Sequence, residues 1–139
     1  MKDRVFLDTN VFIYMQSSDE PEKCGVSKNA IGAYDCCVST QVLNEVCNVL
    51  TKKLKMRTDE VKKIIKGINS NCKVGLVNHD TVQKALDLKD KYGYSYYDSL
   101  IIASAIESGC EKLFSEDMQD GQIIESTLEI VNIFKGSQP

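Results

Sequence analysis

The sequence predicts an α/β fold in which helices cover both faces of a mostly parallel sheet. Short β-favouring runs alternate with helix-length segments along the chain, and this alternation is typical of a parallel sheet between two helical layers. Of the 139 residues, 42% are hydrophobic and 27% are charged, which is close to the average for globular domains and excludes a disordered or fibrous chain. We expect one domain over residues 1–136 and a loose tail at 137–139.

The first two strands are expected on either side of a helical stretch. Arg4 to Leu7 is a short β-favouring run that ends at Asp8, and the apolar patch Val11 to Met15 predicts a helix after the turn. A polar stretch and an amphipathic segment continue to about Tyr34. The second strand is expected over Asp35 to Val38.

Two helices follow the second strand. Thr40 is the expected N-cap of the first, and Thr58 is the expected N-cap of the second, which ends at Asn69 to Asn71. The apolar residues of the first helix recur at helical spacing and form one stripe. This stripe consists of Val42, Leu43, Val46, Val49 and Leu50.

The second half of the chain repeats the alternation. Val74 to Val77 is the expected third strand, and a helix runs from about His79 to Tyr92. Ser95 to Asp98 has the S-x-x-D form of a capping box, which predicts the start of another helix. The fourth and fifth strands are expected at Leu113-Phe114 and Leu128 to Ile133.

The sequence has no features of export or membrane insertion. The longest apolar stretch, Leu100 to Ile106, is much shorter than the ~20 residues of a membrane span, and the N-terminus lacks a signal-peptide pattern. We therefore expect a soluble, cytoplasmic protein with no membrane partner and with reduced thiols at its six cysteines. The missing C-x-x-C spacing and the single histidine, His79, argue against a structural zinc site.

Acidic residues stand where parallel sheets bind ligands, beyond the carboxyl ends of the strands. Asp8 ends the first strand, Asp117 follows the fourth, and Glu45 and Asp98 lie on helices that begin near strand ends or tight turns. Four carboxylates in one cleft would repel one another by about 1–4 kcal/mol per pair at about 4 Å. Protons or a divalent cation must offset this repulsion, and hard oxygen ligands favour Mg²⁺ or Mn²⁺, which can activate water for phosphodiester hydrolysis.

Each of these acids also fits a purely structural role. Asp98 is explained as the acid of the capping box, Asp8 and Asp117 as turn residues, and Glu45 as a solvated helix acid that borders the core. The residues alone therefore suggest a metal site but do not distinguish it from these structural roles.

Four motifs in this sequence resemble those of PIN-domain ribonucleases, most closely the VapC-type toxins. The resemblance extends from Val5 to Phe134 and implies that the expected domain is a PIN domain. It also implies a three-layer α/β/α sandwich with a five-stranded parallel sheet in the order 3-2-1-4-5. The motifs are Leu7-Asp8-Thr9-Asn10, Ser39 to Glu45, Tyr97 to Ile101 and Leu113 to Met118.

The resemblance implies a Mg²⁺- or Mn²⁺-dependent endoribonuclease that leaves 5′-phosphate and 3′-hydroxyl ends. Asp8, Asp98 and Asp117 would hold the metal, and Glu45 would orient the attacking water or a second ion. These four residues match the catalytic acids of the family.

Other residues match supporting positions of the family. Asn10 and Ser115 would order the carboxylates around the metal. Asp120 has no fixed counterpart, so it either joins the metal site or is an exposed turn acid.

The partners implied by the resemblance are an RNA substrate, a cognate antitoxin whose tail occupies the active site, and a second copy of the chain. The helix over Val11 to Met15 fits an antitoxin or homodimer interface, and equally a buried first helix. Tyr94, Tyr96 and Tyr97 fit either base stacking or core packing.

The net charge of −3 argues against a protein that holds nucleic acid by bulk positive charge. Between Lys52 and Lys66, however, seven basic residues stand against two acidic ones, which gives +5 for this segment and leaves −8 for the rest. Basic residues here fit either contacts to the RNA backbone or a solvated helix face. The candidates for RNA contacts are Lys52, Lys53, Lys55 and Arg57.

Two alternative functions remain open from the sequence. The first is a phosphotransfer domain in which Asp8 is phosphorylated, although Asn10 replaces the second acid of haloacid-type phosphatases and no lysine stands at a strand end. The second is a non-catalytic PIN-like module that only binds RNA or a protein.

Overall fold

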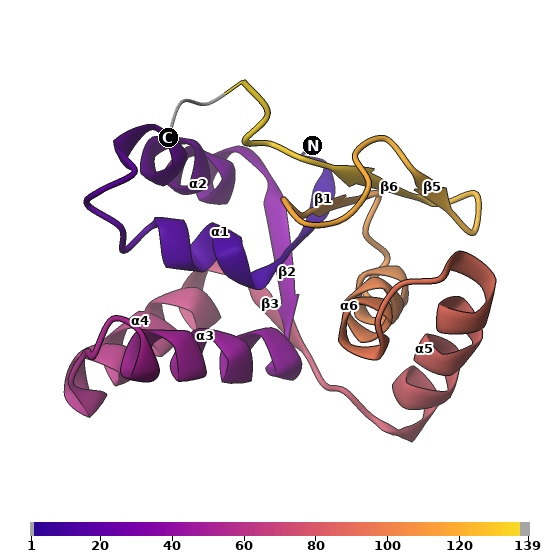
Figure 1. The fold of residues 1–139 in the computed structure, drawn as a ribbon, viewed down its shortest axis with the longest axis horizontal. Coiled ribbons are helices and arrows are strands. Elements are labelled where there is room, and N and C mark those ends of the chain that lie inside the picture. Colours follow the sequence, from indigo (N-terminus) through magenta and orange to yellow (C-terminus); the bar gives the residue numbers. More distant parts are fainter. Residues whose placement is uncertain (1, 137–139) are drawn as a thin grey trace.

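Residues 2–136, the part of the chain that the computed structural model describes, form one six-stranded sheet in the order β3-β2-β1-β4-β6-β5 (Figure 1). The strands are β1 (Arg4–Leu7), β2 (Asp35–Ser39), β3 (Lys73–Gly75), β4 (Lys112–Phe114), β5 (Ile123–Ile124) and β6 (Leu128–Val131). The helices are α1 (Thr9–Tyr14), α2 (Pro21–Ala33), α3 (Thr40–Lys52), α4 (Thr58–Asn71), α5 (His79–Tyr92) and α6 (Tyr96–Glu107). The tail expected at 137–139 lies outside the described residues.

The sheet confirms the predicted parallel order and adds one strand. β1 pairs in parallel with β2 and β4, β2 with β3, and β4 with β6, so that β6 takes the fifth place. The added strand, β5, is antiparallel to β6. The predicted fifth strand ends at Val131 instead of Ile133, and the third is Lys73–Gly75 instead of Val74 to Val77, because Leu76 leaves the sheet and faces solvent.

Two helical layers enclose the sheet, as predicted. Figure 1 shows α1 to α4 on one side of the strands and α5 and α6 on the other. This arrangement follows from right-handed crossovers, because the chain moves outward from β1 to β3 and then returns across the sheet to β4.

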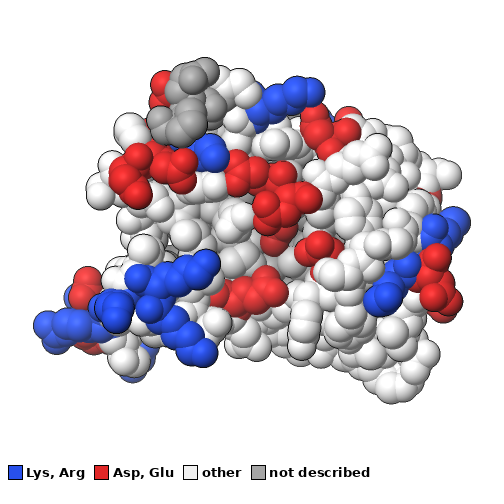
Figure 2. Space-filling view, in the orientation of Figure 1, with Lys and Arg blue, Asp and Glu red and all other residues white. Residues whose placement is uncertain are grey.

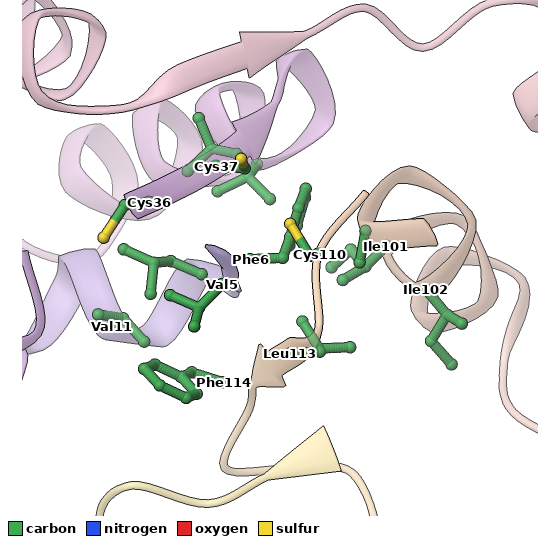
Figure 3. Packing of buried hydrophobic residues seen from close by; sticks show 14 of the residues in the cluster. Val5, Phe6, Val11, Cys36, Cys37, Ile101, Ile102, Cys110, Leu113 and Phe114 are labelled. Atoms are coloured by element: carbon green, nitrogen blue, oxygen red, sulfur yellow. The ribbon is translucent and has the colours of Figure 1, made fainter. Parts of the chain in front are cut away.

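The core lies on both faces of the central strands (Figure 3). Val5, Phe6 and Leu7 of β1 are fully buried, because strands lie on both sides of β1 and helices lie above and below it. Each large side chain buried in this way contributes on the order of 2 kcal/mol to folding. The packing around β1 therefore fixes the position of its carboxyl end and of the residue that follows it.

Two of the three predicted N-caps are displaced by one residue. Ser39, and not Thr40, is the N-cap of α3, because β2 runs directly into the helix and the Ser39 Oγ accepts a hydrogen bond from the Val42 N–H at 3.4 Å. Arg57 takes the N-cap place expected for Thr58 and makes no side-chain capping bond. For α6 the predicted cap is confirmed, since the Ser95 Oγ accepts from the Asp98 N–H at 3.2 Å.

Among the described residues, no helix is long and apolar enough to cross a bilayer. The six cysteines are all free thiols in the structure, and four of them are buried.

Candidate active site

The four predicted acids line one cleft of about 310 Å³ at the carboxyl end of the central strands. Asp8 directly follows β1, Asp117 lies in the loop after β4, Glu45 is on α3, and Asp98 is in the first turn of α6. Figure 2 shows acidic side chains gathered around the centre of this face of the molecule. Residues from four distant segments therefore meet where the sequence predicts a site.

Asp8 is the most buried acid of the cleft, with 8% of its surface exposed. One carboxylate oxygen, Oδ1, accepts from the Thr9 N–H at 2.7 Å, which makes Asp8 the N-cap of α1. The other, Oδ2, accepts from the Ser115 hydroxyl at 2.9 Å. The side chain thus has both the structural role and the cleft position that the sequence left open as alternatives.

Burial raises the pKa of Asp8 to about 6 from an ordinary value of 3.8. The hydrogen bonds from Thr9 and Ser115 act in the opposite direction, and the charges of Glu45 and Asp98 add to the increase. Desolvation and nearby negative charge therefore both disfavour the ionised form of this carboxylate.

Glu45 is half-buried at the edge of the core, as its place on the helix predicts. The Thr9 hydroxyl donates to Glu45 Oε1 at 2.6 Å, and the Gln41 side-chain amide donates to Oε2 at 3.2 Å. The sequence interpretation missed both donors, although Gln41 precedes Glu45 by one helical turn. These two hydrogen bonds fix the orientation of the carboxylate.

Asp98 and Asp117 complete the cleft on its more open side. Burial raises the pKa of Asp98 above its ordinary value, and the charges of Asp117 and Glu45 add to this effect. Asn10, on α1, donates from its side-chain amide to Asp117 Oδ2 at 3.1 Å. The structure therefore places Asn10 beside one of the acids.

Asp120 lies away from the cleft. Its Oδ1 accepts from the Asn132 N–H at 2.8 Å, and its Oδ2 is 3.4 Å from the ammonium of Lys135. Asp120 therefore contacts the segment after β6 and does not line the acidic cleft.

The donor set of the cleft fits a hard divalent cation. The acids offer only oxygen ligands, and within residues 2–136 none of the ion pairs includes any of the four. In the same residues, no group of three His, Cys, Asp or Glu side chains stands at the spacing that metal ligation requires. Burial is the main cause of the raised pKa values of Asp8 and Asp98, and a cation would offset the smaller contribution of the neighbouring negative charges.

The predicted basic residues lie beside the cleft without lining it. Lys52 ends α3, and Lys53, Lys55 and Arg57 belong to the turn before α4. All four are exposed, and Arg57 forms an ion pair with Asp59 at 3.2 Å. Figure 2 shows basic side chains gathered next to the acidic centre on this face.

The three candidate tyrosines have different surroundings. The Tyr94 hydroxyl donates to Gln122 Oε1 at 2.5 Å, and Tyr96 packs against the core. Tyr97 is exposed over 64% of its surface. Only Tyr97 among these three is free to contact a ligand with its ring.

A parallel α/β sheet with an unpaired acidic cleft at its carboxyl edge defines a class of domain suited to divalent cations and phosphate groups. Within that class, the model of the PIN domain family matches residues 5–119. The chain belongs to the PIN domain family. No curated protein matches the sequence significantly.

Solved structures with the same fold include proteins of toxin–antitoxin systems. A toxin–antitoxin complex from Klebsiella pneumoniae matches with a TM-score of 0.68 and 19% identity, over 93% of this chain and 97% of that chain. VapC20 from Mycobacterium tuberculosis, a sarcin-ricin loop cleaving toxin, matches with a TM-score of 0.66 and 19% identity, over 81% and 91%. VapBC2 from Rickettsia felis, solved with a promoter DNA fragment, matches with a TM-score of 0.64 and 16% identity, over 91% and 98%.

Proposed function

We propose that this protein is a divalent-metal-dependent endoribonuclease and the toxin of a type II toxin–antitoxin pair. A single PIN domain over residues 1–136, acting in the cytoplasm, would perform the reaction. The observation that carries the proposal is the meeting of four carboxylates in one cleft of a PIN-family chain, where none of them has a cationic partner within residues 2–136. The alternative in which Asp8 is phosphorylated finds no support in the cleft, because no lysine is among its lining residues.

Asp8, Asp98 and Asp117 would hold Mg²⁺ or Mn²⁺. When bound, such an ion polarises the scissile phosphate and lowers the pKa of a nearby water. Ser115 would orient Asp8 through its 2.9 Å hydrogen bond, and Asn10 would orient Asp117 through its 3.1 Å hydrogen bond.

Glu45 would position the attacking water and take its proton. Its two oxygens are already fixed by Thr9 and Gln41, which leaves further acceptor positions on a carboxylate of defined orientation. The oxygen of water attacks phosphorus, the bond from phosphorus to the 3′ oxygen breaks, and the leaving oxygen takes up a proton. The products carry a 5′-phosphate and a 3′-hydroxyl.

The proposed partners are an RNA, a cognate antitoxin and a second copy of this chain. Support for the antitoxin comes from the shared fold with proteins described as toxin–antitoxin complexes. A mostly apolar groove of about 330 Å³ offers a place for a partner, between Phe12 and Met15 on one side and Ile64 and Ile68 of α4 on the other. Basic residues at Lys52, Lys53, Lys55 and Arg57 would contact the RNA backbone.

Incubation of the purified protein with total RNA tests the proposal. We expect cleavage with Mg²⁺ or Mn²⁺ and none with an added chelator. Asp98→Asn is expected to abolish cleavage without unfolding the protein, because Asn keeps the shape of the side chain and removes one charge. Asp87→Asn is the matched control, since Asp87 is an exposed acid on α5, far from the cleft lining. Full activity of Asp98→Asn, or cleavage that survives the chelator, would contradict the proposal.

A further inference from the structure

A second hollow adjoins the acidic cleft and shares part of its wall. It has a volume of about 350 Å³ and is lined by Gln41, Asn44, Glu45, Asn48 and Tyr97. Glu45 and Asn48 also line the acidic cleft. A chain held with one phosphate at the acids would therefore extend directly into this hollow, which we name the amide groove.

Three amide side chains form one wall of the amide groove. Gln41, Asn44 and Asn48 are separated by three and four positions on α3, so that they lie on the same face of the helix. Asn44 and Asn48 are exposed, and their side chains make no hydrogen bond within the described residues. Each amide offers both donors and an acceptor, which is the combination that the edge of a nucleobase requires.

Gln41 lines the amide groove with a side chain that is almost completely buried. The residue is only 8% exposed, and its amide nitrogen donates to Glu45 Oε2 and to the Tyr97 carbonyl, each at 3.2 Å. Because both neighbours are acceptors, the nitrogen must face them, and Oε1 is left buried without a partner. An unpaired buried acceptor costs free energy, and among the described residues this cost falls on the side chain that joins Glu45 to Tyr97.

Tyr97 adds an exposed aromatic ring to the lining of the groove. The ring lies edge-to-face with Tyr96, at 5.3 Å between centroids and an interplanar angle of 67°. Tyr96 packs against the core and thereby limits how Tyr97 can turn. An exposed aromatic ring beside polar amides is typical of a surface on which unpaired bases stack.

We propose that the amide groove binds one unpaired nucleobase next to the scissile phosphate. Tyr97 stacks on the base, and Asn44 and Asn48 contact its edge. The inference rests on the proposed function and adds to it a base-contacting site on this chain, which only an unpaired base can occupy, because the bases of a duplex stay stacked.

The first experiment combines protein and RNA changes in a double-mutant cycle. A single-stranded oligoribonucleotide with a mapped cleavage site is compared with versions that carry an abasic nucleotide at each flanking position. We expect the abasic change at one position to lower kcat/KM of the unchanged protein by about tenfold, and Tyr97→Ala to lower it similarly on intact RNA. Combining the two changes should lower kcat/KM little further than either change alone, because both remove the same contact.

Matched variants separate stacking from general damage. Tyr97→Phe keeps the aromatic ring and should stay within about twofold of the unchanged protein. Leu86→Ala removes an exposed apolar side chain on α5, outside both hollows, and should have no effect. Asn44→Ala and Asn48→Ala should change the ratio of rates among the four bases at the sensitive position, whereas Asn69→Ala, an exposed amide on α4, should not.

A binding measurement keeps this inference separable from the proposed function. An oligoribonucleotide with 2-aminopurine at the sensitive position is added to Asp98→Asn protein, and quenching of its fluorescence reports stacking. If the unchanged protein cleaves no RNA, the probe is tested at each position in turn. Quenching that is lost in the Asp98→Asn, Tyr97→Ala double variant supports the groove even if cleavage fails. Unchanged quenching in that double variant, or additive effects in the cycle, would overturn the inference.

Discussion

Asp8 combines two roles in a single side chain. Its position directly after a fully buried strand fixes it at the cleft, and its hydrogen bond to the Thr9 N–H begins α1. The charged form is disfavoured there, because burial and the neighbouring acids raise its pKa to about 6. The site thus contains a carboxylate whose ionisation costs stability in the metal-free protein.

We expect Asp8→Asn to stabilise the metal-free protein at pH 8 by about 2 kcal/mol. A raised folded-state pKa favours folding at low pH, and this contribution is lost as the pH rises through 6. Asn is uncharged and is an equally good N-cap. The variant should therefore not lose folding stability in this way as the pH rises. Urea unfolding with chelator at pH 5 and pH 8 measures the difference, with Asp87→Asn as control. If the free energy of unfolding depends equally on pH in Asp8→Asn and in the unchanged protein, the raised pKa of Asp8 is contradicted.

Thr9 is a positioning residue for Glu45. We expect Thr9→Val, which replaces the hydroxyl by a methyl group of similar size, to lower kcat by about tenfold with little change in KM. The reason is the loss of the 2.6 Å hydrogen bond that orients Glu45. Single-turnover cleavage of an oligoribonucleotide measures the effect. Thr9→Ser should restore the rate to within about twofold, and a Ser variant as slow as the Val variant would refute the role.

At the scale of the elements, α6 shows how a helix buried on most sides delivers an acid to the cleft. Every residue from Ser99 to Ala105 is buried, because the helix lies between the sheet and α5. Only the first turn of α6 reaches the edge of the sheet, and it carries Tyr97 and Asp98 there. The packing of the apolar residues therefore determines the position of the functional ones.

Ser95 sets the start of that helix. We expect Ser95→Ala to lower the free energy of unfolding by about 1 kcal/mol, since the Asp98 N–H loses its acceptor. Ser95→Asn should retain most of the stability. Ser70→Ala on α4, where the hydroxyl only bonds back to the Lys66 carbonyl, is the control and should change stability by less than about 0.5 kcal/mol. Urea denaturation compares the three, and equal stability of Ser95→Ala and the unchanged protein would count against the cap.

At the scale of the whole molecule, one polar cluster joins three separate segments next to the site. Glu116 accepts from the Tyr14 hydroxyl at 2.5 Å and from the Lys23 ammonium at 2.7 Å. Tyr14 belongs to α1, Lys23 to α2, and Glu116 to the loop after β4 that also carries Asp117. The cluster therefore holds the Asp117 loop against the helical layer.

We expect Glu116→Gln to destabilise the protein by about 1 kcal/mol at pH 7. Burial acts to raise the pKa of Glu116, but the hydrogen bonds from Lys23 and Tyr14 outweigh burial and lower it below the ordinary 4.5. The stabilisation is therefore present above that value and is lost as the pH falls through the folded-state pKa. Unfolding midpoints measured from pH 7 down to about pH 3 should converge for the variant and the unchanged protein. Glu111→Gln, an exposed acid, is the control, and a difference that persists at the lowest pH would contradict this account.

The helices, most strands and the meeting of the four acids in one cleft were predictable from the sequence, because they depend on local order along the chain. Each acid stands beside a strand end or a helix start, and the direction of parallel strands then brings them to one edge. Thr9 and Gln41 were missed because their contacts with Glu45 depend on how α1 and α3 lie relative to each other. The strand at Ile123–Ile124 was missed because two residues cannot show alternation.

That short strand has a consequence for how the molecule can assemble. The sheet ends at a two-residue strand on one border and at the three-residue strand Lys73–Gly75 on the other. Neither border is long enough to recruit an extended chain through main-chain pairing, which is the route to uncontrolled aggregation. The short borders therefore protect this sheet from growing by the addition of strands from other molecules.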